Sequence, residues 1–477
     1  MKTEKRKLEM YGGLFGGLMP LLVLIVVLIW ISVNEKGAVS AFWTGGWLAI
    51  VAGLFLAKDK KYYCQVIIEG IGSKTGATIV AAWLFAGVFG KLMVAGGLVD
   101  GLLWLGLQTG ATGSIFTLIA FIAAMLFSLG TGTSTGTVLA LVPVLYPAGV
   151  LLGANPAMLA VAILGGAAFG DNLAPVSDTT IVSALTQEAE LKDVVKSRAP
   201  LALVAAAIAA IILLIFGGGG TVQITNLSEM NIAVDPKGLF VAVSFIVVIV
   251  SALKGNDIIE SLIYGNIVAM VMGVLSGKMT LAAILSLPAN RGESTGLIEA
   301  GISGVTAAII FALIVLGITE ILVRSGVMDA ILDWALRTVA KTVKQAEFAI
   351  IAITIIFSIP IAANAPALMV VGPSFVKPLG EKFKLAKARC ANLMDCAVCT
   401  LFFTLPWHIA VIVWYGALVT ASESFDLVLP SINAAFLNPY CWALLLVLCI
   451  SVITGWNRKF EKTQIESSNE EIQEENE

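Results

Sequence analysis

Two aspartates flank a proline in the polar stretch "GDNLAPVSDTT" at residues 170–180. Asp171 precedes Pro175 and Asp178 follows it, and the whole stretch lies within a long apolar region. A carboxylate near the centre of a bilayer is energetically expensive, so its default interpretation is functional. Carboxylate, hydroxyl and carbonyl oxygens together suit a small hard cation. Buried carboxylates that repel each other also hold protons. The stretch therefore predicts a site for a small cation, a proton, or both in turn.

The backbone around these aspartates is expected to be broken. Pro175 lacks an amide donor and biases the residue before it away from helical geometry, and Gly170 is expected to loosen the preceding turn. The next half-helix would begin near residues 177–180, which suit an N-cap. Two structural interpretations stay open: Asp178 only caps this half-helix, and Asp171 only lies in a wet vestibule.

Composition places the chain in a membrane. It has 477 residues, 58% hydrophobic and 13% charged, with a mean hydropathy of +0.95, whereas soluble domains are about half apolar and a quarter charged. Apolar runs of about twenty residues recur along it, as in a polytopic helical membrane protein. The net charge of -3 gives no reason to expect nucleic acid. The cysteines lack paired spacing, so a disulfide framework is not predicted. Cys396 and Cys399 form a CxxC without a second ligand pair, so zinc is not predicted either.

The chain repeats itself at a spacing of about 230 residues, as many transporters do. "GGLVDGLLWLGL" at 96–107 aligns with "SGVMDAILDWAL" at 325–336. "FSLGTGTSTGTVLALVP" at 127–143 aligns with "FSIPIAANAPALMVVGP" at 357–373. Identity between the copies is weak, and chance similarity of two apolar segments is the alternative. We interpret the pattern as a duplication.

Lys and Arg indicate that the two copies face opposite ways, because cytoplasmic loops collect these residues. The comparisons pair 95–115 with 324–344, 147–157 with 377–389, and 187–198 with 419–430. In the first two pairs only the second member carries Lys or Arg, and in the third only the first does. Opposite orientation of two copies is the inverted-repeat signature of secondary transporters.

The same charges place both ends of 115–150 outside and both ends of 348–376 inside. Each segment therefore enters and leaves the membrane on one side. The arms at 115–130 and 138–150 are shorter than the about 20 residues that a full span needs. We predict two re-entrant hairpins with tips near the midplane, at "TGTSTGT" (131–137) and "PIAANAP" (360–366). A pair of tilted full spans is the alternative.

The predicted fold is an all-α polytopic membrane protein of two inverted repeats, each with a re-entrant hairpin and a broken transmembrane helix, with about ten spans plus the two hairpins. Residues 98–109 and 327–342 are predicted to form interfacial helices. The predicted divisions are an N-terminal helical pair and scaffold (1–62), repeat one (63–198, with hairpin 115–150 and broken helix 156–186), three linking helices (199–280), repeat two (281–430, with hairpin 348–376 and broken helix 390–418), a last helix (431–456) and an acidic disordered cytoplasmic tail (457–477).

Together, "GDNLAPVSDTT" and the upstream "GTSTGT" resemble the NhaC-type sodium/proton antiporter family, within the wider superfamily of inverted-repeat ion transporters. The general resemblance covers about residues 60–455, but the sharp motifs lie in the first half. It implies Na⁺-linked transport, a scaffold with a moving transport domain, and a homodimer. The family also includes malate/lactate exchangers, so the organic solute stays open. The cation-binding positions that the resemblance implies are Thr133, Ser134, Asp171, Asn172, Ser177, Asp178 and Thr179, with Na⁺ at Asp171 and Asp178.

The second copy lacks both carboxylates. Asn364 corresponds to Ser134, and His408, the one histidine of the chain, corresponds to Ser177. With Trp407 they would suit a ligand that has an apolar body and a polar or anionic group. Plain packing of Trp407 and a hydrogen-bonded core His408 are the alternatives.

Two further polar residues of the second copy are candidates for gating. Asn392 and Asp395 share one helical face, and Asp395 is a candidate gate or proton relay, or a partner of Lys387 or Arg389. Outside these positions, Glu320 and Arg324 are expected to form an interfacial pair.

Two functions remain. The first is a Na⁺/H⁺ antiporter in which Na⁺ and H⁺ compete for a mid-membrane carboxylate site. The second is a Na⁺- or H⁺-coupled carrier or exchanger of a small organic anion or amino acid. The chain shows no selectivity-filter ring and no nucleophile–base set, so neither a channel nor an enzyme is predicted. No cofactor is expected besides the transported ions. The expected location is a bacterial-type plasma membrane, with both termini cytoplasmic.

Overall fold

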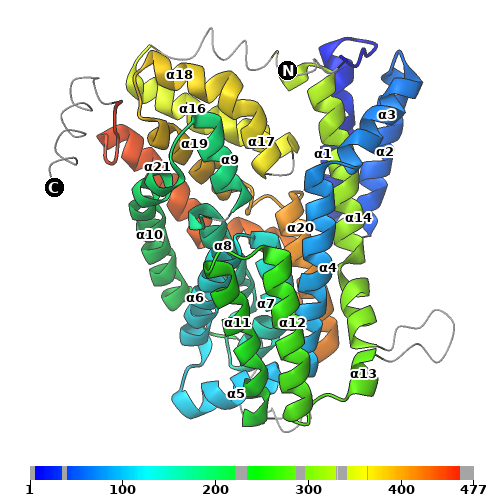
Figure 1. Ribbon diagram of the computed structural model, residues 1–477, viewed down its shortest axis with the longest axis vertical. Helices are drawn as coiled ribbons and strands as arrows, with labels where there is room; N and C mark the ends of the chain where they lie inside the picture. The colour runs from blue at the N-terminus through cyan, green and yellow to red at the C-terminus, as the bar shows by residue number, and fades with distance from the viewer. Residues whose placement is uncertain are drawn as a thin grey trace.

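The computed structural model describes residues 6–34, 40–175, 177–220, 234–285, 296–328, 330, 341–361 and 364–461. Within these ranges all regular secondary structure is helical, in agreement with the predicted all-α class. Figure 1 shows the helices gathered along the long axis of the molecule. Parts of three predicted features lie outside the described residues: the interfacial helix 327–342, the second hairpin tip and the acidic tail.

The N-terminal part forms two packed helices and a third that the sequence analysis missed. They are α1 (Leu14–Asn34), α2 (Ala41–Leu56) and α3 (Lys60–Ile71). Asp59 caps α3 by accepting a hydrogen bond from the Tyr62 amide at 2.9 Å. The helix is short and carries Lys60, Gln65 and Glu69, so it lacks the long apolar run on which the prediction relied.

Repeat one contains α4 (Lys74–Ala95), the predicted interfacial helix α5 (Leu98–Thr109), the hairpin arms α6 (Gly113–Thr131) and α7 (Ser134–Leu151), and the two half-helices α8 (Pro156–Leu173) and α9 (Asp178–Gln187). The hairpin turns at Gly132, which adopts a left-handed conformation with φ 65°, one that residues with a side chain rarely take. Thr133 caps α7 by accepting from the Gly136 amide at 3.3 Å.

Connecting elements follow repeat one. They are α10 (Leu191–Phe216), η2 (Pro236–Ala242), α11 (Val243–Leu253), α12 (Ile258–Leu275) and α13 (Leu281–Leu285). Helix α10 begins at Leu191 rather than near the predicted residue 199, so Arg198 lies inside a helix and not in a loop.

Repeat two has the same order of elements. It contains α14 (Leu297–Arg324), α16 (Val343–Ile361), α17 (Asn364–Val371), η3 (Gly372–Val376), α18 (Lys377–Lys382), α19 (Lys387–Leu401) and α20 (Ile409–Phe425). After repeat two come η4 (Ile432–Leu437) and the last helix, α21 (Pro439–Thr454). The return arm of its hairpin contains one turn of π-helix at Gly372–Val376. The break between α19 and α20 is longer than that between α8 and α9, and it contains Pro406.

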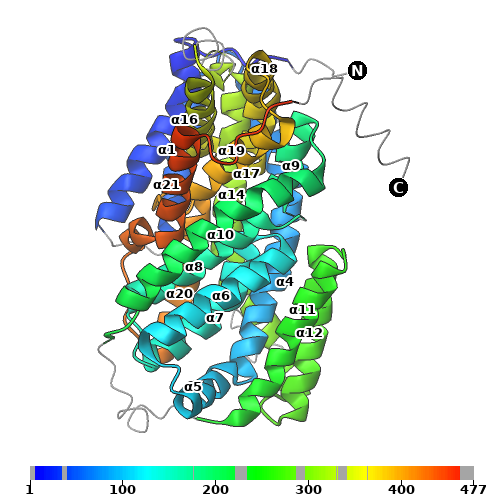
Figure 2. The same cartoon turned by 90° about the vertical axis from the view of Figure 1, so that its left-hand side faces the viewer.

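The two repeats are arranged in opposite directions. In both Figure 1 and Figure 2, hairpin α6–α7 occupies the lower half of the molecule and α16–α18 the upper half. Correspondingly, α8 lies below α9, and α19 lies above α20. This is the arrangement of an inverted repeat, with the two hairpins in opposite halves of the molecule.

Nine helical stretches among the described residues are long and apolar enough to cross a membrane. Both arms of the first hairpin are among them, with 19 residues in Gly113–Thr131 and 18 in Ser134–Leu151. The predicted arm lengths were therefore too short, because α6 begins at Gly113 and α7 begins at Ser134, inside the threonine-rich tip. Re-entry of this hairpin stays a prediction, since length alone no longer favours it over two full spans.

Polar contacts join loops that the charge analysis placed on the same side. Lys377 Nζ lies 2.6 Å from Glu188 Oε1, so the predicted inside segments 187–198 and 377–389 meet. The hydrogen bond from Lys377 and its charge hold the pKa of Glu188 below its ordinary value. At the other end, Lys278 pairs with Asp100 at 3.1 Å, so both lie on the face predicted to be outside.

The half-helices of each repeat are bonded to the other repeat. Gln187 at the end of α9 donates to the Gly372 carbonyl of hairpin two at 3.2 Å. Trp414 of α20 donates to the Ala160 carbonyl of α8 at 2.9 Å. Tyr146 of hairpin one donates to the carbonyl of Val428, just beyond α20. The two repeats therefore form one interlocked core.

Candidate functional site

The tip of the first hairpin and the break in the first repeat meet at Asp171. Ser134, the first residue of α7, donates to Asp171 Oδ2 at 2.9 Å. Ser177, just before α9, donates to Asp171 Oδ1 at 2.8 Å. Thr179 Oγ1 lies 2.9 Å from Ser177 Oγ and donates to the Asp171 carbonyl at 3.4 Å. We call Ser134, Asp171, Ser177 and Thr179 the Asp171 cluster.

Local sequence explains why Asp171 lies at the end of a half-helix. Helix α8 ends at Leu173, and Ala174 is extended at φ −65° and ψ 128°, as expected for a residue before proline. Gly170 does not loosen the turn: α8 runs through it, and a Cβ there would lie 2.3 Å from Ser128 Cβ on α6. The glycine instead lets α8 approach α6 closely, next to the hairpin tip.

Asp178 occupies a different environment from Asp171. The Asp171 side chain is 5% exposed, whereas Asp178 is exposed. Asp178 is the first residue of α9, where a negative charge is stabilised by the positive end of the helix dipole. The two carboxylates therefore differ: one is enclosed by hydroxyl donors, and the other lies at the mouth of the break.

Two other predicted cation-site residues lie beside the Asp171 cluster but have other partners. Thr133 caps α7, and its Oγ1 also lies 3.4 Å from Thr135 Oγ1. Asn172 is fully buried, and its Nδ2 has no hydrogen-bond partner among the described residues. Its Oδ1 accepts from the Cys396 thiol at 3.8 Å. Asn172 thus presents a free amide donor rather than an oxygen ligand.

A buried arginine, Arg198, is the main residue that the sequence analysis missed. Its guanidinium, fully buried, forms an ion pair with Asp395 of α19 and donates to the Asn172 carbonyl. It also donates to Thr180 Oγ1 at 2.9 Å. Asp395 therefore pairs with Arg198, and not with Lys387 or Arg389. An aspartate inside a membrane segment is usually paired with a basic side chain. A search for a basic partner of Asp395 could therefore have identified Arg198.

Neighbouring polar groups complete this network. Arg198 Nε donates to Asn392 Oδ1 at 3.0 Å, and Asn392 Nδ2 donates to Ser197 Oγ at 2.6 Å. Ser183 Oγ donates to Asp395 Oδ2 at 3.2 Å. We call Arg198, Asp395, Asn392, Thr180 and Ser183 the Arg198 network. It joins α10, the two half-helices of repeat one and α19 of repeat two.

The second copy brings His408, Trp407 and Asn364 to its own breaks. His408 is the N-cap residue of α20, in the place that Ser177 has before α9. It is 1% exposed, its Nε2 lies 3.2 Å from the Ser358 carbonyl, and its ring centroid lies 3.4 Å from that of Phe402. Within the described part of the chain, Asn364 Oδ1, Trp407 Nε1 and His408 Nδ1 are buried without a hydrogen-bond partner.

The oxygens around Asp171 are one enclosed carboxylate, hydroxyls and backbone carbonyls. Oxygen ligands of these kinds suit a hard cation. Among the described residues no group of three or more His, Cys, Asp or Glu side chains could hold a metal ion.

Known proteins resemble the chain most clearly in its first half. Residues 14–218 match the model of the Na⁺/H⁺ antiporter family. An NhaC Na⁺/H⁺ antiporter of Alkalihalophilus pseudofirmus is 22% identical over 435 residues, which cover 85% of this chain and 89% of that protein. A malate-2H⁺/Na⁺-lactate antiporter of Bacillus subtilis is 30% identical over 168 residues, 35% of each chain.

Shorter and more distant similarities complete the comparison. An uncharacterized Na⁺/H⁺ antiporter of Haemophilus influenzae is 28% identical over 144 residues, 30% of each chain. The matches to this protein and to the Bacillus protein thus span only about a third of each. The solved YdaH transporter of Alcanivorax borkumensis aligns over 92% of this chain and 99% of that chain, with 13% identity and a TM-score of 0.44. The predicted resemblance is confirmed by the family match and the NhaC relative: this chain is a multi-pass membrane protein that is similar to the Na⁺/H⁺ antiporter family over residues 14–218.

Proposed function

We propose that this protein is a secondary active antiporter that exchanges Na⁺ for H⁺ at the Asp171 cluster. One observation carries the proposal: a carboxylate that is 5% exposed receives hydrogen bonds from hydroxyls of two separate broken segments, Ser134 and Ser177. The same oxygens can turn toward a Na⁺ ion. Because a bound Na⁺ and a bound proton each neutralise the Asp171 charge, binding of one would exclude the other.

The opposed half-helices support an exchange site at this place. The carbonyl end of α8 and the amide end of α9 face each other across the break, which provides both oxygens for a cation and donors for a carboxylate. Asp178 at the mouth of the break would attract Na⁺ and share its charge. Opposite placement of the two hairpins supports alternating access from the two sides.

We propose the membrane location and the oligomeric state of the protein from its charge distribution and its family resemblance. The clustering of Lys and Arg supports a cytoplasmic location for both termini in a bacterial-type plasma membrane. The family resemblance supports a homodimer. Neither the location nor the oligomeric state determines which ion Asp171 binds.

A second candidate function is transport of a small organic anion together with Na⁺ or H⁺. The observation that favours it is the set of buried, unpartnered polar atoms in the second copy, at Asn364, Trp407 and His408. Such atoms are costly unless a ligand or water pairs with them. The Bacillus relative is named as an exchanger of malate and lactate, which makes a hydroxy acid a reasonable test solute.

Proteoliposomes separate the two functions. An outward Na⁺ gradient should drive proton uptake in the absence of any organic solute, and Asp171→Asn should abolish it. Asp193→Asn, which removes an exposed carboxylate on α10, is the matched control and should keep wild-type flux. Flux that requires a solute such as malate or lactate would instead favour the carrier. Sodium-driven proton flux that survives Asp171→Asn would contradict the site.

A further inference from the structure

A tryptophan of α4 contacts the tip of the first hairpin. Trp83 Nε1 donates to Thr135 Oγ1 at 3.0 Å, and Thr135 is the second residue of α7, directly after Ser134. Trp83 is 2% exposed. Tryptophans of membrane proteins gather at the two membrane–water interfaces, whereas Trp83 lies near the middle of the 22-residue α4. Its N–H group therefore serves a contact inside the molecule and not anchorage at the membrane surface.

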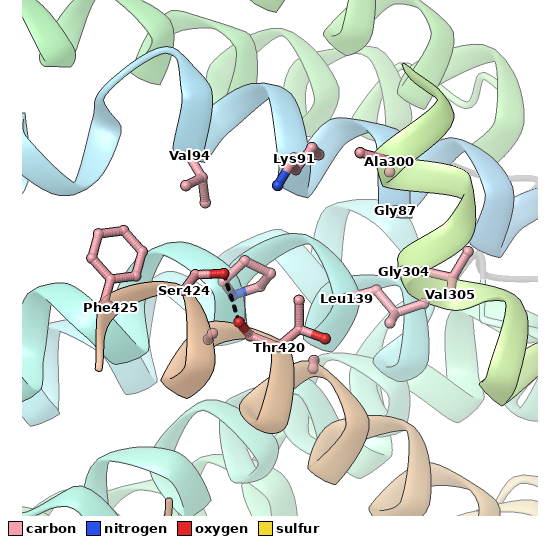
Figure 3. Close-up of a pocket in the computed structure, with 14 residues that line it drawn as sticks. Gly87, Lys91, Val94, Leu139, Ala300, Gly304, Val305, Thr420, Ser424 and Phe425 are labelled. Carbon is pink, nitrogen blue, oxygen red and sulfur yellow. Dashed lines mark hydrogen bonds between the residues drawn. The ribbon is translucent and has the colours of Figure 1, made fainter. Parts of the chain in front are cut away.

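The helices α4 and α7 approach closely on this side because a glycine lies between them. A Cβ on Gly90 would lie 2.7 Å from the Leu139 carbonyl oxygen of α7, a distance too short for a side chain. Further toward α5, Lys91 and Val94 of α4 line a pocket together with Leu139 (Figure 3). The close part of the interface thus lies between Gly90 and Trp83, next to the hairpin tip.

Ser134 and Thr135 fasten the start of α7 in two directions. Consecutive residues of a helix point about 100° apart. Ser134 donates to Asp171 of α8 at 2.9 Å, and Thr135 accepts from Trp83 of α4. A shift of the tip away from α4 would therefore also move Ser134 relative to Asp171.

The direction of hydrogen bonds in the tip follows from the indole. An indole N–H can only donate, so Thr135 Oγ1 is the acceptor and its own hydrogen is available to Thr133 Oγ1, 3.4 Å away. Thr133 Oγ1 also accepts from the Gly136 amide at 3.3 Å. These bonds within the tip are local, so they shape the turn but do not orient it toward α8. The bond from Trp83 connects the tip to a neighbouring element.

We propose that Trp83 is a positioning residue for the cation site. By holding Thr135, it keeps Ser134 at hydrogen-bond distance from Asp171, where the Ser134 oxygen can turn toward a bound Na⁺. Trp83 acts through the hairpin tip and not as a ligand, because its N–H offers no lone pair to a cation. The inference rests on the proposed Na⁺ exchange at the Asp171 cluster and adds a residue of α4 to that site.

The Na⁺ affinity of purified full-length variants, measured by calorimetric titration with NaCl, tests this role. Trp83→Phe should weaken Na⁺ binding by about fivefold, the effect of one neutral hydrogen bond, and Thr135→Val should weaken it at least as much. Thr135→Ser keeps the acceptor oxygen and should bind Na⁺ like the wild type. Because both changes remove the same bond, the double variant Trp83→Phe/Thr135→Val should bind about as well as Thr135→Val alone.

Trp43→Phe is the matched control. Trp43 of α2 donates to the Ala307 carbonyl of α14 at 3.0 Å, so this variant removes an equivalent bond elsewhere and should keep wild-type Na⁺ affinity. In buffer without Na⁺, backbone hydrogen exchange of the tip at residues 127–137 should be faster in Trp83→Phe than in Trp43→Phe. Wild-type Na⁺ affinity in Trp83→Phe would overturn the proposal, and so would a double variant whose loss is the product of the two single losses.

Asp171→Asn distinguishes a failure of this proposal from a failure of the exchange site. Lost Na⁺ binding in Asp171→Asn together with wild-type binding in Trp83→Phe would refute the role of Trp83 alone. Na⁺ binding that survives Asp171→Asn would refute the exchange site, and with it the effect of Trp83 on the cation. Faster hydrogen exchange of the tip in Trp83→Phe would still support the positioning in that case, and unchanged exchange would refute it as well.

Discussion

Ser177 occupies the N-cap position of α9 but does not cap the helix with its side chain. It has the extended backbone of an N-cap, yet its side chain makes no cap hydrogen bond to α9 and donates to Asp171 instead. A side-chain cap is typically worth about 1 kcal/mol. A local rule broken in this way is expected at functional sites. From the sequence, Ser177 was both a candidate N-cap and a candidate cation-binding residue, and the sequence did not distinguish these two roles.

The difference between Asp171 and Asp178 leads to a prediction on sodium binding. Asp171→Asn should abolish saturable Na⁺ binding, because the enclosed carboxylate is the main ligand. Asp178→Asn should weaken binding by about tenfold, ~1.4 kcal/mol, since Asp178 is exposed and acts through its charge. Wild-type affinity should also fall as pH falls, because protons compete. Calorimetric titration with NaCl measures the Na⁺ affinity of the two variants, and titrations of the wild type at several pH values measure the competition with protons.

The reverse order of the two variants would contradict the central place of Asp171. If Asp178→Asn lost Na⁺ and Asp171→Asn kept it, the ion would lie at the mouth of the break. Circular dichroism and thermal unfolding of each variant show whether a lost signal reflects misfolding.

At the scale of elements, the half-helix α9 is held from several sides. Arg198 of α10 contacts Thr180 and the end of α8, and pairs with Asp395 of α19. The predicted positions of both breaks were close to those observed, because Pro175 and Pro406 mark them in the sequence. The partner of Asp395 could not be predicted in the same way. The start of α10 depends on packing against repeat two, and Arg198 was counted as a loop charge.

The Arg198–Asp395 pair should behave as a coupled unit in stability measurements. Arg198→Met and Asp395→Leu should each cost about 3–5 kcal/mol, because each leaves one buried charge without a partner. The double variant should cost clearly less than the sum of the two. The unfolding free energies of the wild type, the two single variants and the double variant, measured by thermal or chemical unfolding in detergent, form this double-mutant cycle. Arg324 with Glu320, the predicted i,i+4 pair at 2.7 Å, provides a control that is closer to solvent.

Strict additivity in the Arg198 cycle would show that the two charges are stabilised separately. Retained Na⁺ binding in the double variant would identify the network as a support for the break. Lost Na⁺ binding with normal unfolding would assign it to the cation site.

At the scale of the molecule, the sequence predicted an inverted repeat and the grouping of its loops. Weak sequence identity between segments about 230 residues apart and the opposite Lys/Arg content of their loops were sufficient for this prediction. Both features follow from the way an inverted repeat crosses the membrane. The missed features, such as α3 and the full length of the hairpin arms, depend on contacts between distant segments. Helix α3 packs against α14, where a Cβ on Gly70 would lie 2.5 Å from the Leu316 carbonyl oxygen, a closeness that no local pattern encodes.

Cysteine labelling tests the orientation of the two repeats. In a Cys64→Ser background, which removes the exposed native cysteine, Gln108→Cys on α5 and Glu381→Cys on α18 should react with an impermeant reagent from opposite faces. Both side chains are exposed, and α5 and α18 lie at opposite ends of the molecule in Figure 1. Labelling of both from one face would contradict the inverted arrangement.

The bonds between each half-helix and the opposite repeat have a consequence for synthesis. Gln187 leaves the ribosome long before Gly372, the residue whose carbonyl it bonds, and α20 is made after the α8 helix that Trp414 contacts. At a translation rate of about 5–20 residues per second, α9 waits roughly 10–40 seconds for its partner. Throughout that time the polar break of repeat one has to remain in the membrane without half of its final surroundings. Two separately expressed halves of this chain should therefore be unstable alone and recover only when they are made together.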